Sequence, residues 1–307
     1  MGKSLDQRGD IAAAQLAVYV PFLAIAAVLT LRHGFSRQAG WVLLVIVSLI
    51  RIVGSATHIA SELAKQTTEG LVITYVVLDA AGLSPLLIAT LGFLGTVAQG
   101  SFDHRPLVPR ALRLLGLVGT AAIALIAAGG ATVATASSPS DLTQGATLRH
   151  AGAILYAVLY AFIFAVHIYF YIGFEIILPH RRTLLVGISA ALPFLLVRVV
   201  FSVLSAYAPA AAIGFPATKH TALTKFSSET GSWQIFLVMS VLMEIIVMII
   251  YITVGLTVRL KDDPVGEKVA YSPDVEMSHS GGGGGGGGGF GLGLFRGRRR
   301  LFGRSRR

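Results

Sequence analysis

Four ionisable residues stand out among those inside the long apolar stretches of the sequence: Arg51, Asp79, Arg198 and Glu244. A charged side chain in hydrocarbon costs at least about 2.5 kcal/mol on insertion scales, so each of them needs a partner or a function. Arginine and carboxylate side chains neutralise one another when paired, and they bind small polar molecules or ions when they line a cavity. We therefore treat these four residues as candidate members of one ligand-binding or structural polar cluster.

Arg51 and Asp79 are predicted to lie at the same depth. Arg51 comes eleven residues after Gly40, or roughly 16 Å along a helix, and Asp79 comes eight residues after Leu71, or about 12 Å along the next, antiparallel helix. An ion pair between the two helices would remove both charges from lipid. Reversing both charges should then restore the expression that is lost in either single reversal. A purely structural pair and a ligand site are equally consistent with this spacing.

Further polar residues accompany this pair. Ser55 and His58 follow Arg51 at i+4 and i+7, which puts them on one helix face. Ser84 lies in the segment Asp79-Ala80-Ala81-Gly82-Leu83-Ser84-Pro85, which combines a charge, a glycine and a helix-breaking proline within two turns. This segment is the preferred candidate for a functional locus, and Ser55, His58 and Ser84 join the candidate cluster.

Arg198 and Glu244 repeat the pattern of Arg51 and Asp79 in the second half of the chain. Each arginine follows a β-branched residue and precedes a serine by four positions, Ser55 in one case and Ser202 in the other. Two parallel groups of three helices joined by a central one would produce such a repeat, as in some small-solute transporters.

A metal site is the weakest of the chemical interpretations. It requires His58, Asp79 and His150 to converge, and no metal-binding motif connects them. We expect no bound metal, no cofactor and no catalytic residue.

The composition shows which elements must position these residues. The chain has 307 residues, of which 54% are hydrophobic and 13% charged, against roughly 25% charged residues in a soluble domain. Because its apolar runs approach or exceed the length of about 20 residues that crosses a bilayer, the protein is predicted to be a multi-pass integral membrane protein, of the plasma membrane or an internal membrane. The chain contains neither cysteine nor asparagine, which excludes disulfides, thiolate sites and N-linked carbohydrate.

Seven spans are predicted, and they are helical because lipid offers no partner for backbone polar groups. The predicted spans are Ile11 to Leu31, Gly40 to Ala60, Leu71 to Val97, Leu112 to Ala134, Ala151 to Ile177, Thr183 to Tyr207 and Trp233 to Val258. The predicted fold is an all-α, seven-transmembrane helix bundle. Residues 1–10 form a short extracellular or lumenal N-terminus, residues 11–258 the helical domain and residues 259–307 a cytoplasmic tail.

The distribution of basic residues predicts an N-out, C-in orientation, because positively charged loops stay in the cytoplasm. One side holds the short basic loops and the tail, with Arg32, Arg37, Arg105, Arg110, Arg113, Arg181 and Arg182 before the tail. The opposite side holds Lys3, Arg8, Lys65, Arg149, Lys219 and Lys225.

The tail has no composition that forms a core. Gly281 to Gly289 are consecutive glycines, which predict a disordered tether. The segment beyond them interleaves apolar residues with Arg296, Arg298, Arg299, Arg300, Arg304, Arg306 and Arg307. These arginines are predicted to contact anionic lipid on the cytoplasmic surface, at about 1 kcal/mol for each basic residue near it. A tail without a defined partner is the alternative, and nucleic acid is not an expected partner.

Four sequence segments resemble a known family, the uncharacterised seven-helix integral membrane proteins of filamentous fungi. The segments are Gly9-Asp10-Ile11, Arg32-His33-Gly34-Phe35 with Gly40-Trp41, Leu49-Ile50-Arg51-Ile52-Val53-Gly54, and Leu78-Asp79-Ala80-Ala81-Gly82-Leu83-Ser84-Pro85-Leu86-Leu87. The resemblance extends from Gly9 to about Arg259. It implies a receptor-like seven-helix topology and no established activity.

Three function classes remain after the better-known seven-helix proteins are tested, and a metal-dependent membrane hydrolase, which would use His58, Asp79 and His150, is the last of them. A retinal protein needs a lysine in its last span, and the stretch from Trp233 to Val258 has none. The leading interpretation is a receptor-like sensor of a small or apolar ligand, and the alternative is a transporter of a small solute or lipid with a three-plus-one-plus-three repeat. A cavity that opens only outward favours sensing, whereas superposable halves favour transport.

Overall fold

The computed structural model describes residues 5–33, 39–64, 69–99, 101, 107–209, 222–228 and 230–258. Close contacts divide the chain into the units Met1–Gly266 and Glu267–Arg307, and every described residue belongs to the first unit. The arginines from Arg296 to Arg307 therefore lie outside the described residues, so their predicted contact with lipid stays a prediction.

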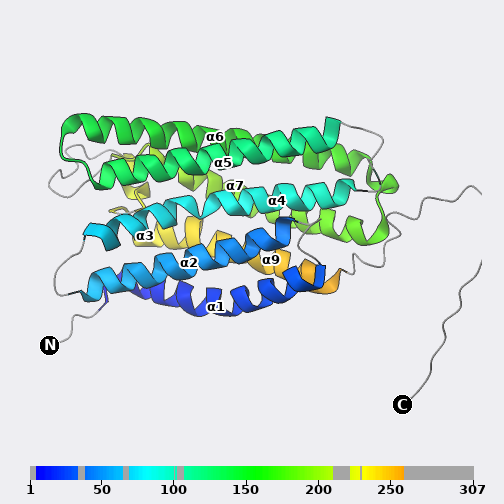
Figure 1. Ribbon diagram of the computed structural model, residues 1–307, viewed down its shortest axis with the longest axis horizontal. Helices are drawn as coiled ribbons and strands as arrows, with labels where there is room; N and C mark the ends of the chain where they lie inside the picture. Colours follow the sequence, from blue (N-terminus) through cyan, green and yellow to red (C-terminus); the bar gives the residue numbers. More distant parts are fainter. Residues whose placement is uncertain are drawn as a thin grey trace, which may run out of the picture. The chain divides into compact units, whose positions relative to one another are not determined.

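The described residues form an all-helical bundle without strands (Figure 1). Its elements are α1 Gln7–His33, α2 Ala39–Leu63, α3 Glu69–Ala81, α4 Leu83–Ala98, α5 Leu107–Ala134, α6 Pro139–Ile172, η1 Phe174–Ile176, α7 Pro179–Ala206, η2 Ala222–Phe226, α8 Trp233–Phe236, η3 Leu237–Leu242 and α9 Met243–Thr257. Within this part of the chain, 7 helical stretches are long and apolar enough to cross a membrane. The predicted all-α fold and the predicted number of helices long and apolar enough to cross a membrane are thereby confirmed.

Span 3 and span 7 are each built from more than one helix. Span 3 consists of α3 and α4, which meet at Gly82, and Pro85 lies in the first turn of α4, where a missing backbone N–H costs little. Span 7 consists of α8, η3 and α9, and η3 is a π-helix. A π-helical turn accommodates one extra residue and is frequent at functional sites. Both irregular points lie close to charged residues of the candidate cluster, Asp79 and Glu244.

The fifth span differs from its predicted bounds. The sequence predicts Ala151 to Ile177, whereas α6 begins at Pro139 and ends at Ile172. Ser138 and Asp141 form a capping box with the backbone at the start of α6, and Gly173 ends the helix. Hydropathy does not detect a polar first turn, so the predicted span begins too late. This change moves Arg149 from a predicted loop into a helix.

The first turn of α1 has a defined cap. The carboxylate of Asp6 accepts hydrogen bonds from the backbone N–H groups of Gly9 and Arg8, both at 2.8 Å. These bonds stabilise the charged form, and the one from Gly9 has the largest effect, so the pKa of Asp6 lies below its usual value. The end of the bundle at which α1 begins is called the N-terminal end below.

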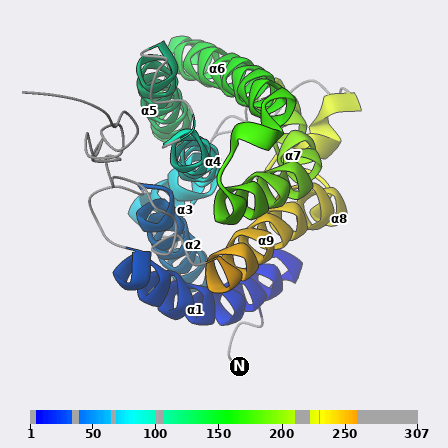
Figure 2. The ribbon, with the colours of Figure 1, turned by 90° about the vertical axis from the view of Figure 1, so that its right-hand side faces the viewer.

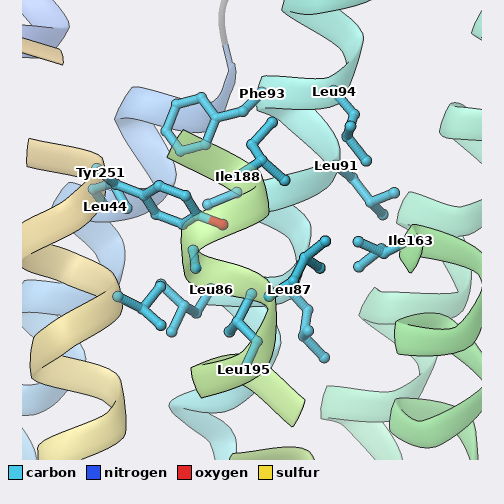
Figure 3. Packing of buried hydrophobic residues seen from close by; sticks show 14 of the residues in the cluster. Leu44, Leu86, Leu87, Leu91, Phe93, Leu94, Ile163, Ile188, Leu195 and Tyr251 are labelled. Atoms are coloured by element: carbon cyan, nitrogen blue, oxygen red, sulfur yellow. The ribbon is translucent and has the colours of Figure 1, made fainter. Parts of the chain in front are cut away.

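The apolar core surrounds α4. In the end-on view of Figure 2, α4 lies between α5 and α7, and 13 of its 16 residues are buried. Figure 3 shows Leu44, Phe93, Ile188 and Tyr251 meeting there from α2, α4, α7 and α9. These four residues, which we call the apolar plug, lie on the side of Arg51 and Glu244 that faces away from the N-terminal end. On that side of the charged residues, these side chains are part of the buried apolar core.

Large apolar side chains on the outer surfaces of the helices suggest contact with a bilayer. Examples on α5, α6, α7 and α9 are Leu117, Phe162, Leu196 and Ile249, all of which are exposed. A water-facing surface rarely exposes so many large apolar side chains, whereas lipid favours them.

Candidate functional site

Arg51 connects two carboxylates from different spans. Its Nη1 donates a hydrogen bond to Asp79 Oδ1 at 2.6 Å, so the contact predicted from depth matching is present. Its Nε donates to Glu244 Oε1 at 2.5 Å, and its Nη2 pairs with Glu244 Oε2. Arg51 and Glu244 thus form the two-pronged pairing that is the strongest geometry available to an arginine and a carboxylate.

Two more side chains complete the group around Glu244. The hydroxyl of Tyr19, on α1, donates to Glu244 Oε1 at 2.8 Å. Arg198 Nε lies 3.6 Å from Glu244 Oε2. We call Arg51, Asp79, Arg198 and Glu244 the charge cluster; together with Tyr19 it joins spans 1, 2, 3, 6 and 7.

The charge cluster is buried except at Asp79. Arg51 and Arg198 are each 4% exposed, Glu244 is 1% exposed and Asp79 is 24% exposed. Its two guanidinium groups and two carboxylates balance in charge, which offsets the cost of burying them. Asp79 is therefore the member that a molecule from outside the bundle reaches first.

The absence of a side chain at Gly82 is required for the position of Arg51. A Cβ atom on Gly82 would lie 2.7 Å from Arg51 Nη2, closer than real side chains approach. The backbone of Gly82 is helical, with φ −60° and ψ −25°, so the glycine is required for space rather than for an unusual conformation. The segment from Asp79 to Pro85 thus supplies both a carboxylate and the room for its partner.

A pocket leads from the N-terminal end of the bundle to Arg51 and Asp79. This first pocket has a volume of about 50 Å³, enough for a few water molecules, and its lining includes Gln15, Ser55 and His58. Gln15 is 7% exposed, and its Nε2 has no hydrogen-bond partner among the described residues. A buried amide donor that lines a pocket and lacks a partner is suited to an acceptor atom of a ligand.

His58 and Ser84 have local partners. The imidazole of His58 stacks on Tyr75 with ring centroids 4.4 Å apart, and its Nε2 lies 3.1 Å from Glu62 Oε1. Ser84 donates to the backbone carbonyl of Gly119 at 2.8 Å, which ties α4 to α5. The structure therefore places Ser55 and His58 in the lining of the first pocket and Ser84 at a helix contact.

A second pocket lies on the other side of Asp79. Its volume is about 30 Å³, and α3, α5, α6 and α7 contribute to its lining, together with Ser228. Arg149 and Arg198 both line it. The two pockets share Asp79 and Ser228.

His150 does not join the other candidate metal ligands. Its imidazole stacks on Tyr207 with ring centroids 4.2 Å apart. Across the part of the chain that the structure describes, no group of three or more His, Asp or Glu side chains is placed to hold a metal ion.

Sequence reasoning missed Gln15, Tyr19 and Arg149. Gln15 and Tyr19 are four residues apart and so share one face of α1, and a polar pair at this spacing inside an apolar span is a signal that was available. The capping box that begins at Ser138 would have extended the fifth span far enough to include Arg149.

The fold and the site together define a multi-pass helical membrane protein with a charged, partly accessible centre. The chain belongs to the family described as domain of unknown function DUF7702, which matches residues 5–261. No curated protein and no solved structure matches the chain.

Proposed function

We propose that the protein is a receptor-like sensor of a small molecule that enters the first pocket from the N-terminal end. One observation supports this proposal above all: the first pocket reaches Arg51 and Asp79, and these residues are tied to span 7 through Glu244. A molecule bound there acts directly on contacts that hold several spans together. The proposal gives the protein no catalytic role.

The ligand that fits this pocket is small and able to form hydrogen bonds. Its acceptor atom pairs with Nε2 of Gln15, which has no partner among the described residues, and its donor atom pairs with the partly exposed carboxylate of Asp79. Arg51 binds Asp79 through Nη1 and Glu244 through Nε and Nη2. A ligand that competes for Asp79 therefore weakens one contact of the guanidinium group and so affects its pairing with Glu244. Ligand binding is thereby coupled to the position of span 7.

The proposed sensor has its N-terminus outside and its C-terminus inside. The distribution of basic loop residues supports this orientation, which makes the first pocket accessible from outside. The apolar plug fills the bundle on the opposite side of the charge cluster, and this supports a cavity with a single entrance.

Thiol labelling tests the entrance of the pocket. The chain has no cysteine, so a single introduced thiol reports on one position. Ser55→Cys lines the first pocket, whereas Ser48→Cys lies on the same helix at a fully buried serine and serves as the matched control. We expect a small, membrane-impermeant methanethiosulfonate reagent to modify the Ser55→Cys thiol from the outer face only and to leave the Ser48→Cys thiol unmodified.

Transport is the second candidate function, and one observation favours it. Arg51 pairs with Asp79 across spans 2 and 3, and Arg198 faces Glu244 across spans 6 and 7, as a three-plus-one-plus-three repeat would require. In a transporter the Ser55→Cys thiol would be modified from both faces, because the site is exposed to each side in turn. No modification from either face would contradict both proposals.

A further inference from the structure

The second pocket carries a surplus of hydrogen-bond donors. It is lined by Arg149 and Arg198 and by Ser202, Ser205 and Ser228, with Asp79 as its one carboxylate among the described residues. Ser205 Oγ accepts a hydrogen bond from the backbone N–H of Ser228 at 3.2 Å, so its own O–H is left to donate. Such a lining is suited to a ligand that accepts hydrogen bonds.

Arg198 is buried without a full set of partners. Its Nε lies 3.6 Å from Glu244 Oε2, which is an ion pair but too long for a hydrogen bond, and this Nε has no hydrogen-bond partner within the described part of the chain. Glu244 has little capacity left, because its two oxygens already accept from Arg51 and Tyr19. A guanidinium group that is 4% exposed and incompletely paired is therefore available to a ligand.

Arg149 adds a charge that no described residue neutralises. It is partly buried on α6, roughly 15 Å from the start of that helix at 1.5 Å per residue. It makes no hydrogen bond or ion pair with any residue that the structure describes, although it lines the same pocket as Arg198. A positively charged side chain within a membrane span is costly unless an anion lies beside it.

Among the described residues, the charged side chains of the second pocket and of the charge cluster sum to one positive charge. They are the guanidinium groups of Arg51, Arg149 and Arg198 and the carboxylates of Asp79 and Glu244. A monovalent anion beside these side chains restores neutrality and accepts hydrogen bonds from the N–H groups of Arg149 and Arg198. Guanidinium groups match a carboxylate best, because its two oxygens accept two parallel N–H bonds.

We propose that the second pocket is an anion-binding subsite that takes the carboxylate group of a small soluble molecule between Arg149 and Arg198. The volume of about 30 Å³ admits a group of this size and excludes a bulky one. The subsite does not depend on the proposed sensor function. Labelling of the Ser55→Cys thiol tests the first pocket, and either labelling result is compatible with an anion in the second pocket.

Acetate is the probe for this subsite. The full chain is placed in nanodiscs of phosphatidylcholine, which carries no net charge, and the midpoint of thermal unfolding is measured as sodium acetate replaces sodium gluconate at constant ionic strength. Gluconate carries its carboxylate on a polyol chain that is too large for the pocket. We expect the midpoint to rise saturably with acetate, because a ligand that binds only the folded state stabilises it.

Variants of Arg149 connect the acetate effect to the pocket. Arg149→Gln removes one charged donor group, and we expect the half-saturating acetate concentration to rise at least about tenfold. Arg149→Lys keeps the charge but loses the planar fork, so its half-saturating concentration should lie between those of the wild type and Arg149→Gln. Arg113→Gln is the matched control, because Arg113 is an exposed arginine on another span, and its acetate response should equal that of the wild type.

Three outcomes would overturn the inference. The first is a wild-type midpoint that does not respond to acetate. The second is an equal change of the acetate response in Arg149→Gln and Arg113→Gln, which would show general screening of charge. The third is stabilisation only when the nanodiscs contain phosphatidylserine, because the carboxylate would then belong to a lipid headgroup rather than to a soluble molecule.

Discussion

Glu244 is the residue on which the charge cluster depends most. It accepts hydrogen bonds from Arg51 Nε and from Tyr19, and it pairs with Arg51 Nη2 and Arg198. The pairing of Arg51 with Asp79 is therefore not isolated. Because an aspartate at position 51 would face Glu244, the double charge reversal at positions 51 and 79 is no longer expected to restore expression.

We predict that Glu244→Gln destabilises the protein more than Asp79→Asn does. Removing the charge of Glu244 leaves two buried guanidinium groups without their shared carboxylate, at a cost of about 3–5 kcal/mol in unfolding free energy. Asp79 is 24% exposed and accepts one hydrogen bond from Arg51, so its loss costs less. Thermal unfolding in detergent measures both effects.

Glu175→Gln is the control for this comparison, because Glu175 is exposed at the opposite end of the bundle. It should leave the unfolding midpoint unchanged. Equal destabilisation by Glu244→Gln and Asp79→Asn would show that the cluster is organised around Arg51 alone.

At the scale of elements, glycines leave room for neighbouring groups at the junction of α3 with α4 and at the contact between α5 and α6. Gly82 leaves room for the side chain of Arg51. The others let two helix backbones approach one another at Gly129, Gly145 and Gly152. Close backbone approach through small residues is the usual way in which helices associate within lipid.

We predict that Gly82→Ala lowers stability by displacing Arg51. The guanidinium group is held by Asp79 and Glu244, so it does not yield freely to a Cβ atom 2.7 Å from Nη2. Gly70→Ala on α3 is the control, because a Cβ atom there meets nothing within 4 Å. We expect a lower unfolding midpoint for Gly82→Ala alone, by about 1–3 kcal/mol in free energy. A similar response of the two variants would mean that helix propensity, and not the Arg51 contact, decides the outcome.

We predict that Gly145→Ala weakens the contact between α5 and α6. Its Cβ atom would lie 2.7 Å from Val133 Cγ2 and 2.9 Å from the carbonyl oxygen of Gly129, and a backbone atom cannot move aside cheaply. Overpacking of this kind costs about 1–3 kcal/mol. Gly116→Ala on α5 should be neutral or stabilising by up to about 1 kcal/mol, because nothing lies within 4 Å of the added atom and alanine favours the helix. Thermal unfolding of the two variants gives the comparison, and an unchanged midpoint for Gly145→Ala would contradict the prediction.

At the scale of the whole molecule, seven spans require the two termini to lie on opposite sides of the membrane. We predict that the N-terminus is outside and the C-terminus inside, because the short basic loops follow the odd-numbered spans. Tags at both ends and protease digestion of sealed, right-side-out vesicles test this. The N-terminal tag should be lost and the C-terminal tag protected, and loss or protection of both tags would contradict seven spans.

The sequence alone determined the number of spans, their helical nature and the contact between Arg51 and Asp79. Hydropathy shows the spans directly, because a run of about 20 apolar residues has few structural alternatives in lipid. Arg51 and Asp79 lie on successive antiparallel helices, so their depths follow from residue counts.

Only the tertiary structure decided which residues share the site with that pair. Glu244 lies 193 residues from Arg51 along the chain, and Tyr19 lies 225 residues from Glu244. Their meeting depends on how each helix is rotated and which helices are neighbours. In water, an apolar face shows how a helix is rotated, but in a bilayer both the lipid-facing and the core-facing surfaces are apolar. Rotation is then set by close packing around glycines and by the pairing of buried charges, and these contacts exist only once the helices have assembled.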